Sequence, residues 1–372
     1  MDRLELAGWL DRVFADEVWH RLDPLPGLPL GVVDDPRRID AAYRWSYFNP
    51  AQIAGNLLSA RGLQMQKRGD PELFVKHLEI VLALVRNLQN ASPQDSANYT
   101  RSIVLRLLQA LDHWLAGLSG RPDLLRRVGD ALARHRATTV SDRERDFAEY
   151  LVTRNTLDNP APWLRLVFEE LGRAGDEGMP SENNWRLGVG SALVHEAELL
   201  PIVFHIPWER ERQERLLRRG FFESDVRDRE ASLMMPIHRP DADWRDRIRR
   251  SWLAPFEAAR LTVALRHHQA TTGKPATDLK QLVPVSIEAI PVDPYDEMPF
   301  RYRLSSGEDV VEGLPGTEAP NMPAGMELAA RKIPAGQGIL WSVGPDRIDG
   351  GGRVFGHSSG DLIYLVPLEK KK

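Results

Sequence analysis

The chain has 372 residues, of which 42% are hydrophobic and 27% charged, so it is long enough to bury two cores. Its 49 lysines and arginines against 53 aspartates and glutamates give a formal net charge of -4. This charge excludes an overall positive potential that would bind a nucleic-acid backbone. The absence of cysteine excludes disulfides, thiolate metal sites and cysteine nucleophiles.

No stretch of the sequence approaches the roughly 20 apolar residues that a membrane-spanning helix needs. The first twenty residues interrupt every short apolar run with a charge, so they do not read as a secretion signal. We therefore expect a soluble chain, and we expect no nucleic acid among its partners.

Residues 1–39 contain four prolines near their end, which predicts one short helix followed by an irregular segment. From there, apolar residues recur at helical spacing over residues 41–219 and predict an all-α region. Two stripes have steps of three and four residues: Phe74, Leu78, Val81, Val85 and Leu88, then Val104, Leu108, Leu111, Leu115 and Leu118.

Turn signals divide this region into separate helices. Gly69-Asp70-Pro71 and Gly120-Arg121-Pro122 each predict the end of one helix and the start of the next. Further helices are expected near residues 124–135, 142–156, 162–172 and 182–200. Because such short turns join antiparallel neighbours, we predict an irregular helical bundle.

The composition changes between residues 209 and 250, where charges of both signs crowd together and two prolines interrupt them. We place a domain boundary here, which predicts an all-α helical domain at residues 1–240 and a second domain at residues 241–372. After Arg250 a helix is expected to resume with Trp252, Phe256, Ala259 and Val263 on one stripe and to end near Gly273.

Three short segments beyond this helix are rich in aromatic and β-branched residues and are separated by turn-forming clusters: residues 300–304, 338–343 and 361–366. One helix followed by a small antiparallel sheet is an α+β module. The predicted fold class of the whole chain is therefore α+β, with the helical bundle preceding this module.

Several motifs of the last third follow one another in a fixed order. Thr272-Gly273 precedes Pro275, a short helix covers residues 279–283, Pro291-x-Asp293-Pro294 makes a turn, and Ser342-x-Gly344-x-Asp346 precedes a closing strand at Asp361-Leu362. In this order the motifs resemble the globular domain of the major pseudopilins of type II secretion, over residues 251–366. The whole chain also resembles planctomycete-type envelope proteins that carry a helical domain before such a module.

Asp346, Asp349 and Asp361, together with Gly350–Gly352, offer the hard oxygen ligands on a flexible backbone that Ca2+ prefers. The resemblance implies that this loop binds Ca2+ and that Asp346 and Asp361 stand at its carboxylate positions, whereas Asp349 is added from its spacing. Two departures are an arginine at position 347, where the family commonly has glycine, and a lengthened loop at residues 354–359. The alternative, in which Asp346 and Asp349 only cap turns, stays open.

Two larger departures concern an insertion and the beginning of the chain. Residues 305–337 form a Pro, Gly and Glu-rich insertion, expected to lack secondary structure and to contact partners. Pseudopilins begin with a leader and a long apolar helix, and residues 1–58 match neither. We therefore expect no filament formation by that helix, and membrane association only through an anchor preceding Met1.

The candidate catalytic and cofactor-binding motifs in the sequence are incomplete. His195-Glu196 does not complete the metalloprotease pattern HExxH because residue 199 is leucine, so a hydrogen bond between His195 and Glu198 is the simpler interpretation. Gly188-Val189-Gly190 lacks the third glycine of a dinucleotide fingerprint. His267-His268 is expected to cap the end of its helix. We thus expect no catalytic and no cofactor-binding residue.

These observations lead to a functional hypothesis. The chain is expected to be a non-enzymatic protein of the cell envelope, or of the periplasmic side of the inner membrane, whose helical domain binds proteins and whose pseudopilin-like module is a structural or docking unit with Ca2+. The alternative is an enzyme with its active site in the helical bundle or at the domain junction. A deep cleft with clustered carboxylates and histidines would favour the enzyme.

Overall fold

The computed structural model of the chain describes residues 3–31, 35, 37–38, 48–90, 94–141, 144, 148, 151–152, 155, 242–310, 331–352 and 361–368. The helices predicted at residues 162–172 and 182–200, the motifs at residues 188–199 and most of the charged region 209–250 lie outside these residues, as does most of the helix predicted at residues 142–156.

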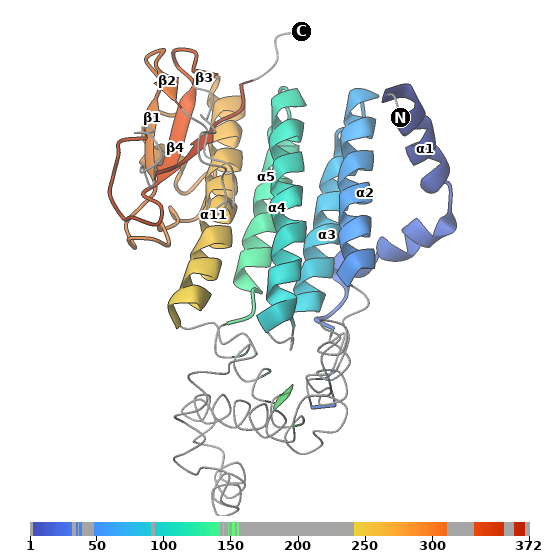
Figure 1. Cartoon of the computed structure of the whole chain (residues 1–372). Coiled ribbons are helices and arrows are strands. Elements are labelled where there is room, and N and C mark those ends of the chain that lie inside the picture. The colour runs from blue at the N-terminus through green and yellow to red at the C-terminus, as the bar shows by residue number, and fades with distance from the viewer. Residues whose placement is uncertain are drawn as a thin grey trace, which may run out of the picture.

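The N-terminal part is one helix, α1 (Arg3–Val13), followed by two short 3-10 turns at Glu17–Leu22 and Leu25–Gly27, which agrees with the predicted short helix and irregular segment. Four longer helices follow and pack on one another: α2 (Phe48–Lys67), α3 (Glu72–Gln89), α4 (Gln94–Gly117) and α5 (Pro122–Ala137). We call these four helices the helical bundle (Figure 1). None of the helices in the described ranges combines the length and hydropathy needed to cross a membrane.

The junction between α2 and α3 forms as its residues predict. Gly69 has a positive φ of 97°, a backbone conformation that residues with a Cβ rarely adopt. The glycine thereby ends α2. One carboxylate oxygen of Asp70 then accepts hydrogen bonds from the backbone N–H groups of Glu72 (3.1 Å) and Leu73 (3.3 Å). Asp70 thus satisfies donors that the first turn of α3 leaves unpaired.

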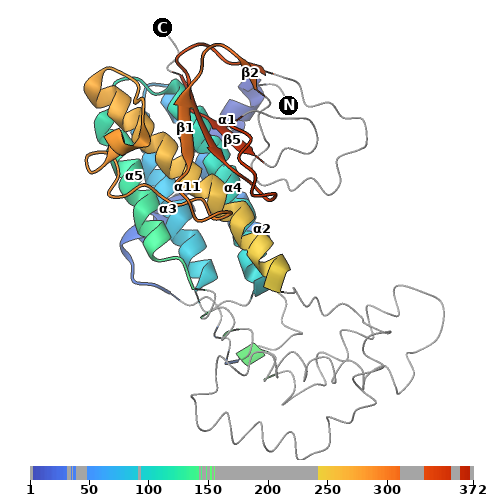
Figure 2. The ribbon, with the colours of Figure 1, turned by 90° about the vertical axis from the view of Figure 1, so that its left-hand side faces the viewer.

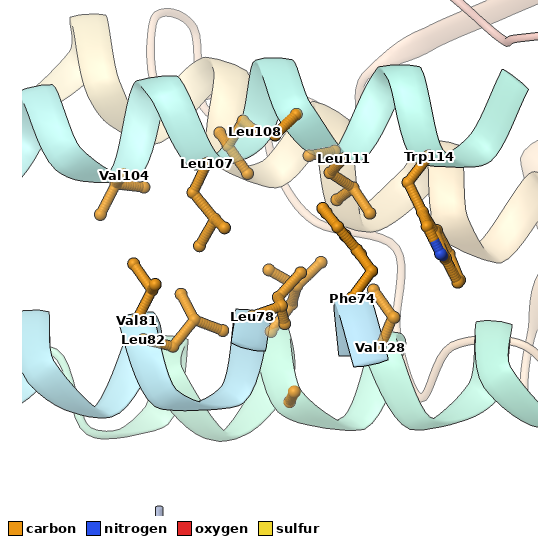
Figure 3. Close-up of a cluster of buried hydrophobic side chains, with 14 of the residues drawn as sticks. Phe74, Leu78, Val81, Leu82, Val104, Leu107, Leu108, Leu111, Trp114 and Val128 are labelled. Atoms are coloured by element: carbon orange, nitrogen blue, oxygen red, sulfur yellow. The ribbon is translucent and has the colours of Figure 1, made fainter. Parts of the chain in front are cut away.

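Both predicted apolar stripes face the core of the bundle. Their ten residues are all buried, and the side chains of α3 and α4 point toward one another (Figure 3). Phe74 stacks on Trp114 with ring centroids 5.3 Å apart, and the Trp114 indole N–H donates to the carbonyl oxygen of Pro71 at 3.1 Å. The aromatic pair therefore contributes packing and satisfies its one polar group.

The long helix α11 (Ala242–Thr272) starts earlier than expected. It was predicted to resume after Arg250, but the charged run before Arg250 already belongs to its first turns. Its end agrees with the prediction, since Gly273 follows Thr272 with a φ of 75°. Charged residues at helical spacing were thus interpreted as part of a boundary, although they extend the helix.

Two opposite faces of α11 are buried in different cores. Trp252, Phe256, Ala259 and Val263, the predicted stripe, belong to the core of the helical bundle. Ala258, Leu261, Ala264 and Leu265 belong to a second core, with Phe300, Leu340 and Val366 among its other members. Figure 1 accordingly shows α11 between the sheet and helices α4 and α5. The predicted division at residues 240 and 241 stays a prediction, since α11 packs on both sides.

The three predicted strands form one antiparallel sheet in the order β1 (Arg301–Leu304), β4 (Gly338–Ser342) and β5 (Leu362–Leu365). Figure 2 shows these strands lying across α11. The insertion at residues 305–337 was expected to lack secondary structure, but its described residues include a two-stranded pair, β2 (Asp309–Val310) and β3 (Arg331–Lys332). Residues 311–330 of the insertion lie outside the described residues. The described residues therefore form an α+β structure: helices with a small antiparallel sheet. We call residues 273–368, together with the sheet-facing side of α11, the C-terminal module.

Candidate functional site

Five aspartates and one arginine gather where the turn before β1 meets the loop after β4. Asp293 and Asp296 lie in the turn, Asp346 and Asp349 lie in the loop, and Asp361 precedes β5. Arg301 opens β1 opposite Trp341 of β4, so strand pairing brings it to the loop. We call these six residues the aspartate cluster.

Asp293 is completely buried and connects the turn to the end of β4. Its Oδ1 accepts hydrogen bonds from the Tyr295 N–H (3.0 Å) and the Ser342 hydroxyl (2.9 Å), and its Oδ2 accepts one from the Val343 N–H (2.8 Å). Burial raises the pKa of the Asp293 carboxyl, although these three donors oppose the rise. The turn predicted from Pro291-x-Asp293-Pro294 is present, with its carboxylate directed inward.

Arg301 makes ion pairs with three carboxylates. Its Nη1 lies 3.5 Å from Oδ2 of Asp293, its Nε lies 3.5 Å from Oδ2 of Asp349, and its guanidinium also pairs with Asp296. Hydrogen bonding to Arg301 holds the pKa of Asp296 below its usual range. One fixed cation therefore links the turn to the loop.

Asp346 and Asp349 both cap turns of the loop. Oδ1 of Asp346 accepts a hydrogen bond from the Ile348 N–H at 3.0 Å, and Oδ1 of Asp349 accepts one from the Gly351 N–H at 2.9 Å. The Trp341 indole N–H also donates to Asp349 at 3.0 Å. Burial tends to raise the pKa of Asp349, but the Trp341 and Gly351 donors together with Arg301 outweigh it and hold the pKa below its ordinary value. The turn-capping alternative thus describes the observed bonds.

Asp361 holds the glycine-rich part of the loop against β5. Its Oδ1 accepts from the Gly350 N–H at 3.1 Å and its Oδ2 from the Gly352 N–H at 3.0 Å. Burial, together with the nearby charges of Asp349 and Asp346, raises the pKa of Asp361. Gly352 is required, because a Cβ there would lie 2.8 Å from the Trp341 ring.

Arg347 adopts the left-handed backbone conformation, with a φ of 59°. This is the position at which the sequence has arginine and the pseudopilins commonly have glycine. A residue with a Cβ is disfavoured there, whereas glycine is not. Arg347 therefore carries backbone strain next to the aspartates of the loop.

The donor set fits Ca2+ in chemical type but is arranged as turn caps. Asp346, Asp349 and Asp361 supply hard carboxylate oxygens and lie close enough for the charges of the first two to raise the pKa of the third. Among the described residues, however, no three acidic or histidine side chains are grouped so that they could hold a metal ion. Calcium binding by these three aspartates stays a prediction.

A pocket at the junction of α11 and the sheet offers little for catalysis. Tyr302 is its one titratable side chain, and the Tyr302 hydroxyl donates to the carbonyl oxygen of Ala276 at 3.0 Å. The other lining residues are Leu265, Gln269, Pro275, Ala276, Gly336, Gly338, Val366, Pro367 and Leu368. This pocket is lined by no carboxylate or histidine, the groups whose clustering in a cleft would favour the enzyme alternative.

The histidine pair lies near the end of α11. His267 lies 2.9 Å from the Ser286 hydroxyl through its Nδ1, and burial lowers its pKa. The hydroxyls of Thr271 and Thr272 donate to the carbonyl oxygens of His267 (2.9 Å) and His268 (2.8 Å), one turn earlier in the helix. These carbonyl groups precede the last four residues of α11, so a capping role of the histidine pair stays a prediction.

Comparison of the chain with known proteins identifies no relative. No family model matches the chain, and no similar protein was found among curated proteins or solved structures.

Proposed function

We propose that this chain is a non-enzymatic protein of the cell envelope, in which the helical bundle is a scaffold for binding proteins and the C-terminal module is a pseudopilin-like docking unit stabilised by Ca2+. One observation carries the proposal: a long helix lies across a three-stranded antiparallel sheet, and an aspartate-lined loop joins β4 to β5 at one end of it. This is the arrangement that the resemblance implies.

The attachment of the module to the bundle supports a docking role. Arg266 of α11 is buried and donates to the carbonyl oxygen of Leu118 at 2.9 Å and to that of Pro367 at 2.7 Å. Glu257 of α11 pairs with Arg136 of α5 at 2.8 Å and also with Arg260. Because these bonds connect both units through one helix, a partner bound to the module would be held in a defined orientation to the bundle.

Site-specific cross-linking of the full chain tests this role. Ile348 of the module is 67% exposed and Ile53 of α2 is 57% exposed, so a photoreactive residue at either position leaves both cores intact. We expect each position to yield a defined cross-link to an envelope protein, and the same residue at exposed Lys280 to yield less. Absence of cross-links at both positions, together with turnover of a small molecule by the purified chain, would contradict the proposal.

The calcium part of the proposal has a separate test in the full chain. The isolated module is unsuitable because Trp252 and Phe256 of α11 would lose their packing against the bundle. We expect millimolar Ca2+ to raise the melting temperature, since a ligand that binds only the folded form stabilises it. Asp346→Ala should remove the rise, and Asp278→Ala, which removes a similar turn bond to the Lys280 N–H, should not. Identical melting curves in Ca2+ and in chelator would refute calcium binding.

A further inference from the structure

The aspartate cluster contains more negative than positive side chains, and Arg301 supplies its cation. Five carboxylates accompany one guanidinium, whose side chain is only 20% exposed. Arg301 reaches three of the five carboxylates, two in the turn and one in the loop. The two segments that it joins are otherwise connected through Asp293, which binds the end of β4.

Oδ2 of Asp349 is the oxygen for which Arg301 and a bound metal ion would compete. Oδ1 of Asp349 already accepts two hydrogen bonds, from the Trp341 indole and from the Gly351 N–H. Oδ2 faces the Nε of Arg301 at 3.5 Å. Ca2+ takes carboxylate oxygens at about 2.3–2.6 Å, so a metal ion at this carboxylate has to compete with the guanidinium for Oδ2. A nearby positive charge also repels any cation that approaches.

We propose that Arg301 is a built-in counter-cation of the aspartate cluster, which joins the turn to the loop as a bound metal ion would and thereby lowers the affinity of Asp349 and its neighbours for a divalent cation. Arg301 is in this sense an affinity-determining residue. The inference rests on the proposed function only in taking Ca2+ as the cation that competes.

Lanthanide binding to the full chain provides the direct test. Tb3+ is a probe for Ca2+ sites, and the Trp341 indole lies close enough to Asp349 to sensitise its emission. We expect Arg301→Gln to bind Tb3+ about tenfold more tightly than the wild type and to gain more in melting temperature from Ca2+, because one positive charge and one competing donor are removed. Arg301→Lys, which keeps the charge, should stay close to the wild type.

Two controls identify the origin of the effect. Lys280→Gln removes an exposed positive charge elsewhere in the module and should leave Tb3+ affinity unchanged. Adding Asp349→Asn to Arg301→Gln should abolish the gain, because Oδ2 of Asp349 is the ligand that the first substitution releases. Should Arg301→Gln fail to fold without metal, millimolar Ca2+ is expected to restore folding.

The outcomes separate this inference from the calcium part of the proposed function. Equal Tb3+ affinity in the wild type and Arg301→Gln overturns the inference, as does an Arg301→Gln chain that remains unfolded in millimolar Ca2+. A response in Arg301→Gln without any response in the wild type supports the inference and refutes calcium binding by the native chain.

Discussion

The helical bundle and the C-terminal module are stabilised by different interactions. The bundle has a large continuous apolar core, in which Phe74 and Trp114 are completely buried. The module has smaller apolar clusters, and buried carboxylates such as Asp293 and Asp361 connect its turns and strands. The difference teaches that the bundle relies chiefly on buried apolar volume, whereas the module combines smaller apolar clusters with specific hydrogen bonds to buried carboxylates.

The largest expected effect comes from removing a side chain of the helix that both regions share. Phe256→Ala deletes a ring that is completely buried on the bundle side of α11, which costs about 3–5 kcal/mol of unfolding free energy. We expect one unfolding transition, because α11 also carries the sheet, when urea unfolding is followed by circular dichroism. The exposed Lys274→Ala is the control. Two separated transitions would show that the regions unfold independently.

A polar substitution should damage the module nearly as much. Asp293→Ala leaves the donors at Tyr295, Ser342 and Val343 without their acceptor in a buried site, which costs about 2–4 kcal/mol. Ser342→Ala removes one of these bonds and should cost less. Chemical unfolding of the full chain measures both, and a loss below that of Ser342→Ala would contradict the role given to Asp293.

Acid should weaken the bundle through His135, which packs against Phe256 with ring centroids 5.5 Å apart. Burial lowers the pKa of His135 to about 4, so the folded chain keeps it neutral while the unfolded chain protonates it near pH 6.5. The unfolded state therefore binds more protons between these values, and stability is complete above pH 6.5 and falls by about 3 kcal/mol toward pH 4.

Stability measured at several pH values checks this expectation. His135→Leu should reduce the loss between pH 6.5 and 4, leaving the part that comes from His77 and His267, whose pKa values burial also lowers. The same substitution at exposed His113 should leave the loss unchanged. An unchanged pH profile in His135→Leu would assign the acid sensitivity to other groups.

The smallest expected effect is a gain. Arg347→Gly relieves the positive φ at this position and should stabilise the chain by about 0.5–1 kcal/mol, the strain removed being partly offset by the greater freedom of glycine in the unfolded chain. Arg347→Ala keeps the strain while removing the charge, so it should bring no gain in melting temperature. Equal gains in both variants would point to charge as the cause.

Much of the helical architecture could be predicted because its signals are local. The stripes of α3 and α4 repeat within a few residues, and Gly69-Asp70-Pro71 encodes its turn without help from the rest of the chain. The second buried face of α11 was not predicted, although Ala258, Leu261 and Leu265 recur opposite the stripe that contains Phe256 and give a local signal for it. A helix with two apolar faces is one covered on both sides.

The aspartate cluster could be predicted only in part because it depends on distant contacts. Asp293 was identified as a turn residue, but its acceptor role follows from Ser342, which is 49 residues away. Arg301 was not identified, because nothing in its local sequence distinguishes it from any other arginine at the start of a strand. Only the pairing of β1 with β4 brings it to Asp349.

The two buried faces of α11 also fix its rotational phase. Each residue of an α-helix turns the chain by about 100°, so inserting or deleting one residue between Phe256 and Ala264 would rotate the following turns away from the sheet. Because a turn contains 3.6 residues, no insertion or deletion of one to three residues in this stretch restores the original phase. The relative orientation of the bundle and the sheet is therefore set by the number of residues in this stretch of α11.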